Sequence, residues 1–193
     1  MMLRSFIAIE LPADLQDTIY ASTSGLQESL PKPLVRWVPP KNLHLTLKFL
    51  GDVSPANLEQ LAEALMVETA KHETFSISVG GLGAFPNSRR ARVIWIGMDA
   101  PASLGTLQHC VESVAERLGY PPEERPFSAH LTIGRTGQNC SASELAKIRS
   151  ELDACRVGSL GSVRVEAIQI FKSDLNPAGS VYTRLYSLAL KSL

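Results

Sequence analysis

The 193-residue chain has few cysteines and no long hydrophobic segment. Its three cysteines, Cys110, Cys140 and Cys155, are an odd number without C-x-x-C spacing, so neither a disulfide framework nor a thiolate zinc site is expected. No apolar run approaches the roughly 18 residues of a membrane-spanning helix, and the first residues lack the features of a secretory signal. We therefore expect a cytoplasmic protein without membrane contact.

The sequence also lacks an excess of charge of either sign. Its 19 basic residues balance 19 acidic ones, so the molecule as a whole exerts no long-range attraction on nucleic acid. Any contact with a polynucleotide must therefore be local. Arg89, Arg90 and Arg92 form a basic cluster that could touch a sugar-phosphate backbone, although a solvated surface loop is the commoner role of such a cluster.

Aromatic residues make up only 6% of the chain, so few side chains could stack on a nucleobase. Trp37, Phe49 and Phe127 are the candidates. Packing in the core is at least as common a role for each of them, and the sequence leaves both roles open.

Histidine is scarce, yet two of the four histidines lie in the same short motif. Leu43-His44-Leu45-Thr46-Leu47 returns 86 residues later as Ala129-His130-Leu131-Thr132-Ile133. From the amounts of histidine and threonine present, chance predicts about 0.2 His-x-Thr pairs in the chain. Alternate side chains of a strand share a face, so each motif presents an imidazole beside a hydroxyl while its aliphatic residues face a core. His72 and His109 have no repeated partner and are interpreted as structural.

The segments around the motifs repeat as well. Strand, helix, histidine strand, helix and strand follow one another twice, with Phe6 and Ile94 separated by 88 residues. Such a duplication lets two similar lobes pack about an approximate two-fold axis, with the His-x-Thr faces on opposite walls of one cleft. No linker or low-complexity segment separates the halves, so we expect a single compact bilobal domain over residues 1–193.

Periodicity and turn residues also predict the limits of several elements. A helix is expected over residues 12–30, because prolines follow it. The same signals predict a strand over 75–82, a loop over 83–90, strands over 163–171 and 181–190, and a turn over 176–179.

Two imidazoles that face each other can act as a general acid and a general base. The hydroxyls of Thr46 and Thr132 can donate hydrogen bonds to the anionic oxygens of a phosphate. This constellation fits cleavage of a phosphodiester without a metal. No His, Cys or carboxylate stands at ligand spacing beside His44 or His130, so neither a metal nor a cofactor is expected.

The sequence resembles the two-histidine phosphoesterase superfamily, in particular the bacterial and archaeal RNA 2′,3′-cyclic phosphodiesterases, formerly called 2′-5′ RNA ligases. The resemblance rests on the paired motifs and extends almost from end to end. Its other carriers are Ser5-Phe6-Ile7-Ala8-Ile9, Arg36-Trp37-Val38, Lys48-Phe49-Leu50-Gly51, Arg125-Pro126-Phe127, Gly134-Arg135, Phe171-Lys172-Ser173-Asp174-Leu175 and Val181-Tyr182-Thr183. Ser128-Ala129 departs from the pattern, since a His-Pro pair often precedes the second histidine in relatives.

The resemblance implies an α+β fold in which two antiparallel sheets line a central cleft and helices lie outside. It also implies that His44 donates a proton to the departing 3′ oxygen and that His130 activates water, which opens a 2′,3′-cyclic phosphate to a 2′-phosphate. Thr46 and Thr132 would hold the phosphate oxygens. Arg135 would contact the phosphate as well, but strict alternation places it opposite His130, so a bend or a strand end must intervene.

RNA ends or small 2′,3′-cyclic nucleotides would be the substrates, and we expect a monomer. Two other functions stay open from the sequence. The first is a 2′-5′ RNA ligase, which runs the reverse reaction through the same site and shares its transition state. The second is a module that binds nucleotides or RNA ends without catalysis, which would not require both histidines and both threonines.

Overall fold

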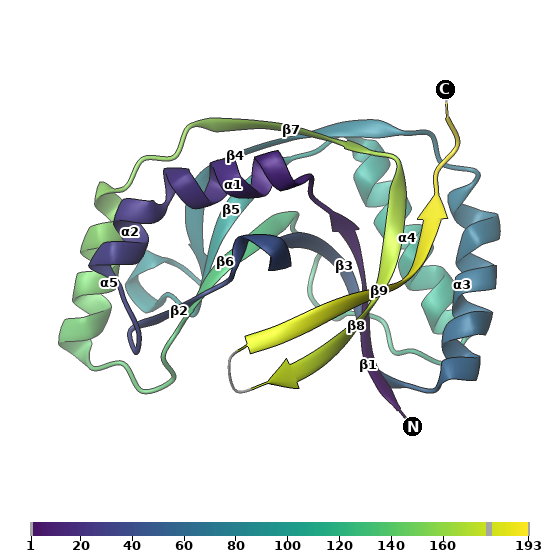
Figure 1. Cartoon of the computed structure of the whole chain (residues 1–193), viewed down its shortest axis with the longest axis horizontal. Coiled ribbons are helices and arrows are strands. Elements are labelled where there is room, and N and C mark those ends of the chain that lie inside the picture. Colours follow the sequence, from purple (N-terminus) through teal and green to yellow (C-terminus); the bar gives the residue numbers. More distant parts are fainter. Residues whose placement is uncertain (1, 177–178, 193) are drawn as a thin grey trace.

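The computed structural model describes residues 2–176 and 179–192, which form two antiparallel sheets with helices at both ends (Figure 1). Sheet A contains, in spatial order, β3 (His44–Val53), β1 (Leu3–Glu10), β8 (Ala167–Asn176) and β9 (Gly179–Ala189). Sheet B contains β2 (Val35–Trp37), β6 (His130–Thr136), β5 (Val93–Asp99), β4 (Phe75–Phe85) and β7 (Ser159–Val165). The helices are α1 (Ala13–Ser22), α2 (Ser24–Ser29), α3 (Pro55–Thr69), α4 (Ala102–Arg117) and α5 (Ala142–Ala154), with 3₁₀ turns η1 (Pro40–Asn42) and η2 (Ser88–Arg90).

The two sheets repeat one arrangement, which confirms the predicted α+β duplication. The order β3-β1-β8-β9 in sheet A corresponds to β6-β5-β4-β7 in sheet B, with a histidine strand first in each series. Each half of the chain also gives strands to the other sheet, since β4 lies in sheet B and β8 and β9 lie in sheet A. One hydrophobic cluster therefore runs through both sheets, from Ile7 and Leu45 to Ile96 and Leu131.

The predicted helix over residues 12–30 is wrong in its continuity, because α1 and α2 are separated at Thr23. The buried hydroxyl of Thr23 donates a hydrogen bond to the carbonyl of Ile19 at 2.9 Å. A threonine hydroxyl that bonds the carbonyl four residues earlier bends a helix, and here the backbone leaves helical geometry at φ −111° and ψ 5°. Among the described residues no helix has the length and apolar character needed to cross a membrane.

The predicted strand over residues 163–171 is also wrong, because β7 ends at Val165 and β8 begins at Ala167 in the other sheet. The burial pattern changes phase at this point. Val163 and Val165 are buried in β7, whereas Ile168 and Ile170 are buried in β8, and a change of phase marks the passage between sheets.

Strand β4 continues to Phe85, so residues 83–85 are not part of the predicted loop. Gly83 permits this because the ring of Trp95 occupies the space that a side chain would need, with Cζ2 2.2 Å from an ideal Cβ position. The predicted turn over 176–179 joins β8 to β9, but residues 177 and 178 lie outside the described residues.

Candidate active site

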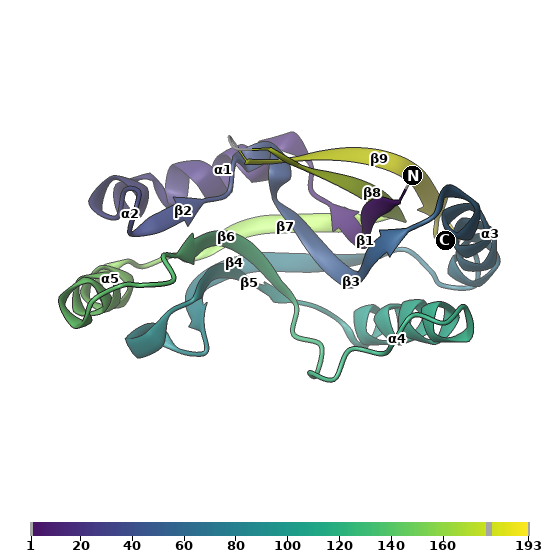
Figure 2. The same ribbon diagram turned by 90° about the horizontal axis from the view of Figure 1, so that it is seen from below.

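The two His-x-Thr motifs lie at the start of β3 and β6. These strands belong to different sheets but come close to each other (Figure 2). Cα atoms of the two strands approach within 8 Å. Leu45 and Leu131 are buried in the core, while the histidine and threonine of each motif are partly exposed. The predicted alternation is thus confirmed. We name the side of each sheet that carries these polar residues its histidine face.

Each histidine strand contains a β-bulge at the same point of its motif. The pairing of β3 with β1 skips Leu47, and the pairing of β6 with β5 skips Ile133. A bulge shifts the alternation by one residue, so the third residue after each threonine returns to the histidine face. These residues are Phe49 and Arg135. The bulge in β6 takes the place of the bend or strand end that was expected between His130 and Arg135, since it brings both side chains to the same face of the sheet.

The two imidazoles have the same hydrogen bond. His44 Nδ1 lies 2.7 Å from the carbonyl oxygen of Asn42, and His130 Nδ1 lies 2.7 Å from that of Ser128. A carbonyl can only accept, so in both rings Nδ1 carries the hydrogen. Nε2 is then the nitrogen that can take up or release a proton at the histidine face.

Aromatic rings surround the imidazoles, and they do so unequally. Phe6 stacks on His44 with centroids 4.7 Å apart, and Tyr182 meets His44 edge-on at 5.3 Å. His130 meets Phe85 edge-on at 5.0 Å. Burial lowers the pKa of His44, and the hydrogen bond to Asn42 opposes this shift only in part.

The sequence did not predict that these aromatic residues lie next to the imidazoles. Phe6 and Tyr182 belong to segments that carry the family resemblance, which was the available signal. Their contact with His44 depends on the pairing of β1 with β3 and of β8 with β9, and Phe85 lay in a predicted loop.

The lowered pKa of His44 predicts a pH-dependent stability. Below about pH 6.5 the unfolded chain binds a proton at this histidine, whereas in the folded chain the imidazole stays neutral to a lower pH. The free energy of unfolding should therefore fall as the pH falls below 6.5, by at most about 1.4 kcal/mol per pH unit from this group. Urea unfolding at pH 7.5 and 5.5 measures the change, and His44→Gln should reduce it. Equal changes in both proteins would contradict this expectation.

The structure separates the aromatic candidates. Trp37 Nε1 donates a hydrogen bond to the carbonyl of Leu30 at 2.9 Å, and the rings of Trp37 and Phe127 pack against the core. Phe49 differs, since it is 63% exposed and lies on the histidine face beside Phe6, with ring centroids 6.2 Å apart. It is therefore the one of the three that is available to stack on a base.

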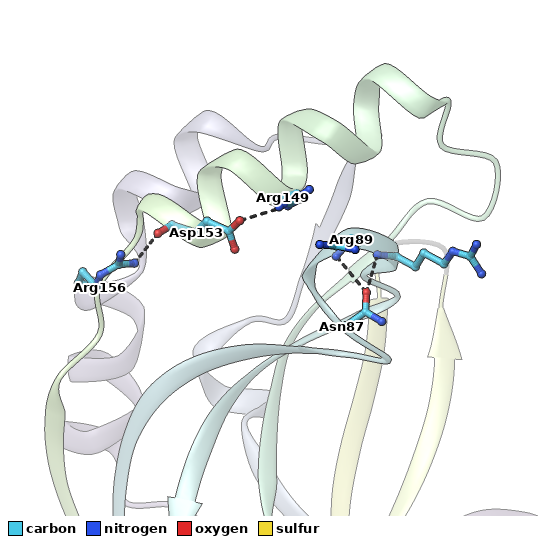
Figure 3. Close-up of polar contacts among 6 residues, drawn as sticks. Asn87, Arg89, Arg149, Asp153 and Arg156 are labelled. Carbon is cyan, nitrogen blue, oxygen red and sulfur yellow. Dashed lines mark hydrogen bonds and ion pairs between the residues drawn. The ribbon is translucent and has the colours of Figure 1, made fainter.

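The basic cluster lies around η2. Asn87 Oδ1 accepts hydrogen bonds from the backbone N–H groups of Arg89 and Arg90 at 3.1 and 3.2 Å (Figure 3). Arg92 instead donates to the carbonyl of Gln138 at 2.9 Å. Arg92 thus has a structural role, and the side chains of the other two arginines stay at the surface.

His72 and His109 line a surface hollow between α3 and α4, and neither motif contributes to its lining. In the described part of the chain, no three His, Cys, Asp or Glu side chains are grouped as a metal site requires. Metal independence stays a prediction.

Comparison with known proteins agrees with the duplication. The family model described as LigT like phosphoesterase matches residues 9–95 and again residues 96–182. The RNA 2′,3′-cyclic phosphodiesterase of Methanothermobacter thermautotrophicus is 36% identical over 185 residues, which are 95% of this chain and 96% of that protein. The enzyme of the same name from Archaeoglobus fulgidus is 32% identical over 188 residues, with 95% and 98% covered.

Solved structures agree as well. Escherichia coli LigT complexed with 3′-AMP is similar with a TM-score of 0.78 and 27% sequence identity, over 98% of this chain and 99% of that one. LigT complexed with NADP+ gives a TM-score of 0.77 at 27% identity, over 98% of each chain. Both the repeated family match and these folds span nearly the whole sequence. The chain therefore belongs to the family of LigT-like phosphoesterases.

Proposed function

We propose that this protein is a metal-independent RNA 2′,3′-cyclic phosphodiesterase that forms 2′-phosphomonoesters. The observation that carries the proposal is the pair of imidazoles, each with Nδ1 bonded to a backbone carbonyl and Nε2 left for proton transfer. The names of the relatives support the substrate class. We further propose that the enzyme acts in the cytoplasm as a monomer, on RNA ends or small 2′,3′-cyclic nucleotides.

In the proposed reaction, His130 Nε2 removes a proton from water as the water oxygen attacks the phosphorus. The bond from phosphorus to the 3′ oxygen breaks, and His44 Nε2 gives its proton to that oxygen. The hydroxyls of Thr46 and Thr132 donate hydrogen bonds to the non-bridging oxygens, where negative charge accumulates. The histidines end with exchanged protonation states, and solvent restores them. The product carries a 2′-phosphate and a 3′-hydroxyl.

The lowered pKa of His44 bears on its role as the acid. An acid with a lower pKa gives up its proton more readily, but fewer molecules of the free enzyme carry that proton near neutral pH. The anionic cyclic phosphate restores the proton on binding, because a nearby negative charge favours imidazolium. The ring of Phe6, which stacks on His44, also stabilises the imidazolium through a cation–π interaction.

The function is tested with protein treated with EDTA and an oligoribonucleotide that ends in a 2′,3′-cyclic phosphate. We expect hydrolysis with addition of one water and a 2′-phosphate product, identified by mass and by ³¹P NMR. No hydrolysis by the wild-type protein, or hydrolysis only after addition of a divalent metal, would contradict the proposal. Tight binding without turnover across pH 5 to 9 would favour the non-catalytic alternative.

A further inference from the structure

Two arginines stand opposite one another on the histidine face of sheet B. Arg36 in β2 is the register partner of Arg135 in β6, and Arg135 pairs on its other side with Val93 in β5. Residues directly opposite in an antiparallel pair point to the same side of the sheet. Since the bulge places Arg135 on the side of His130, Arg36 lies on that side too, and both arginines are exposed.

This pair of like charges has no counterion among the residues that the structure describes. Over residues 2–176 and 179–192, neither guanidinium forms an ion pair with a carboxylate. By contrast, Arg184 lies 3.0 Å from Glu10. Like charges directly opposite on neighbouring strands are unfavourable, and an anion between the two guanidinium groups would remove that cost.

The arginine pair also breaks the symmetry of the duplication. The position that corresponds to Arg135 in sheet A is Phe49, and β3 is the edge of its sheet. Sheet B alone has the extra strand β2, which brings Arg36 beside the second motif. The two histidine faces therefore differ in charge at the third residue after each threonine, which is Phe49 in sheet A and Arg135 in sheet B. This difference allows them to distinguish the two ends of a substrate.

We propose that Arg36 and Arg135 together bind the phosphodiester on the 5′ side of the terminal nucleotide, so that the enzyme prefers the ends of RNA strands to mononucleotides. This inference rests on the proposed function. Thr132 and Arg135 pair with Trp95 and Val93, two residues apart in β5, which corresponds to about 7 Å along a strand. That span is about one nucleotide of an extended strand. The second phosphate would thus contact the arginine pair while the threonines hold the cyclic one. Arg135 is therefore assigned to the neighbouring phosphate and not, as the family resemblance implies, to the cyclic phosphate.

Three substrates test the inference: adenosine 2′,3′-cyclic phosphate, the diadenosine with the same cyclic end, and that dinucleotide with an uncharged methylphosphonate linkage. For the wild-type enzyme, kcat/KM should be higher for the charged dinucleotide than for the other two. Arg36→Met should lower the ratio of charged dinucleotide to mononucleotide about tenfold. Raising the salt concentration should reduce the same ratio in the wild type, because the contact is electrostatic.

Arg149→Met is the matched control, because it removes one positive charge from a residue that pairs with Asp153 on α5 at 3.3 Å (Figure 3). It should leave activity and the substrate ratio unchanged. The inference is overturned if Arg36→Met has the same ratio of charged dinucleotide to mononucleotide as Arg149→Met, or if the wild type hydrolyses the methylphosphonate as well as the charged dinucleotide. It is also overturned if Arg36→Met leaves this ratio unchanged while a third variant, Arg89→Met, lowers it.

Equilibrium binding keeps this test separate from that of the proposed function. Titration calorimetry with the 2′-phosphate forms of the two dinucleotides, which are products and are not turned over, should show tighter binding of the charged form than of the methylphosphonate, and Arg36→Met should remove the difference. If the wild type hydrolyses nothing but shows this difference, the proposed function fails and the arginine site stands. If the substrates are hydrolysed but their 2′-phosphate forms bind equally, the arginine site fails and the function stands.

Discussion

Replacement of His44 or His130 by alanine is expected to lower kcat/KM for a 2′,3′-cyclic phosphate by about 10²- to 10⁴-fold in each case. Each change removes one proton-transfer group from the histidine faces. The double variant should lose less than the product of the two factors, because the two groups act in a single step. Initial rates by liquid chromatography measure the effect. A loss below about threefold from either change would contradict the acid–base proposal.

A second substrate separates the two roles. Sulfur in place of the 3′ oxygen of the cyclic phosphate makes a leaving group that departs as a thiolate and needs no proton. If His44 is the acid, the rate of His44→Ala should recover by at least tenfold on the sulfur substrate, relative to the wild type. His130→Ala should show no such recovery, because water still needs its base. Recovery in His130→Ala instead would reverse the assignment.

Stability must be matched before these rates are compared. His44 is enclosed by Phe6 and Tyr182, so alanine at this position leaves a gap among aromatic rings. His44→Gln is therefore the companion variant, since it fills more of the space but cannot transfer a proton as imidazole does. Both variants should lower kcat/KM to a similar extent while their thermal unfolding differs. Activity in His44→Gln close to that of the wild type would show that the ring matters only for packing.

Alternation was enough to predict which side chains of the motifs face the core. Leu45 and Leu131 are buried, and the histidines and threonines are not, because a strand with one buried face has only one register that satisfies its apolar residues. The same rule fails beyond the threonines. A bulge adds one residue to one strand only. Nothing in the local pattern at Leu47 or Ile133 reveals it, since these residues continue the apolar alternation of Leu45 and Leu131.

Contacts between distant segments account for the rest of what the sequence did not show. The addition of β2 to the sheet of the other half places Arg36 beside Arg135, which are 99 residues apart in the sequence. The passage from β7 to β8 likewise depends on which sheet has room for each strand, as does the contact of Phe6 with His44. Pairing of this kind is decided by the whole core and not by a window of neighbouring residues.

Replacement of Lys48 by methionine is expected to lower the free energy of unfolding by about 3–5 kcal/mol. The bulge at Leu47 turns Lys48 away from the histidine face, and its ammonium lies 2.6 Å from Glu112 on α4 and 2.9 Å from the carbonyl of Pro121. The side chains of Lys48 and Glu112 are only 3% and 14% exposed. Removal of the lysine leaves the carboxylate poorly solvated and without its counterion, which costs more than the pair itself contributes.

Urea unfolding followed by tryptophan fluorescence measures this effect, and Lys71→Met is the matched control. Lys71 pairs with Glu68 at 2.8 Å, but the two side chains are 62% and 29% exposed, so its loss should cost no more than about 1 kcal/mol. The double change Lys48→Met with Glu112→Leu should recover part of the stability, because no charge is then left buried. Equal destabilisation by Lys48→Met and Lys71→Met would show that the Lys48 pair is solvated. Since this pair joins β3 to α4 and to the segment before His130, its loss should also lower kcat more than it raises KM in the protein that stays folded.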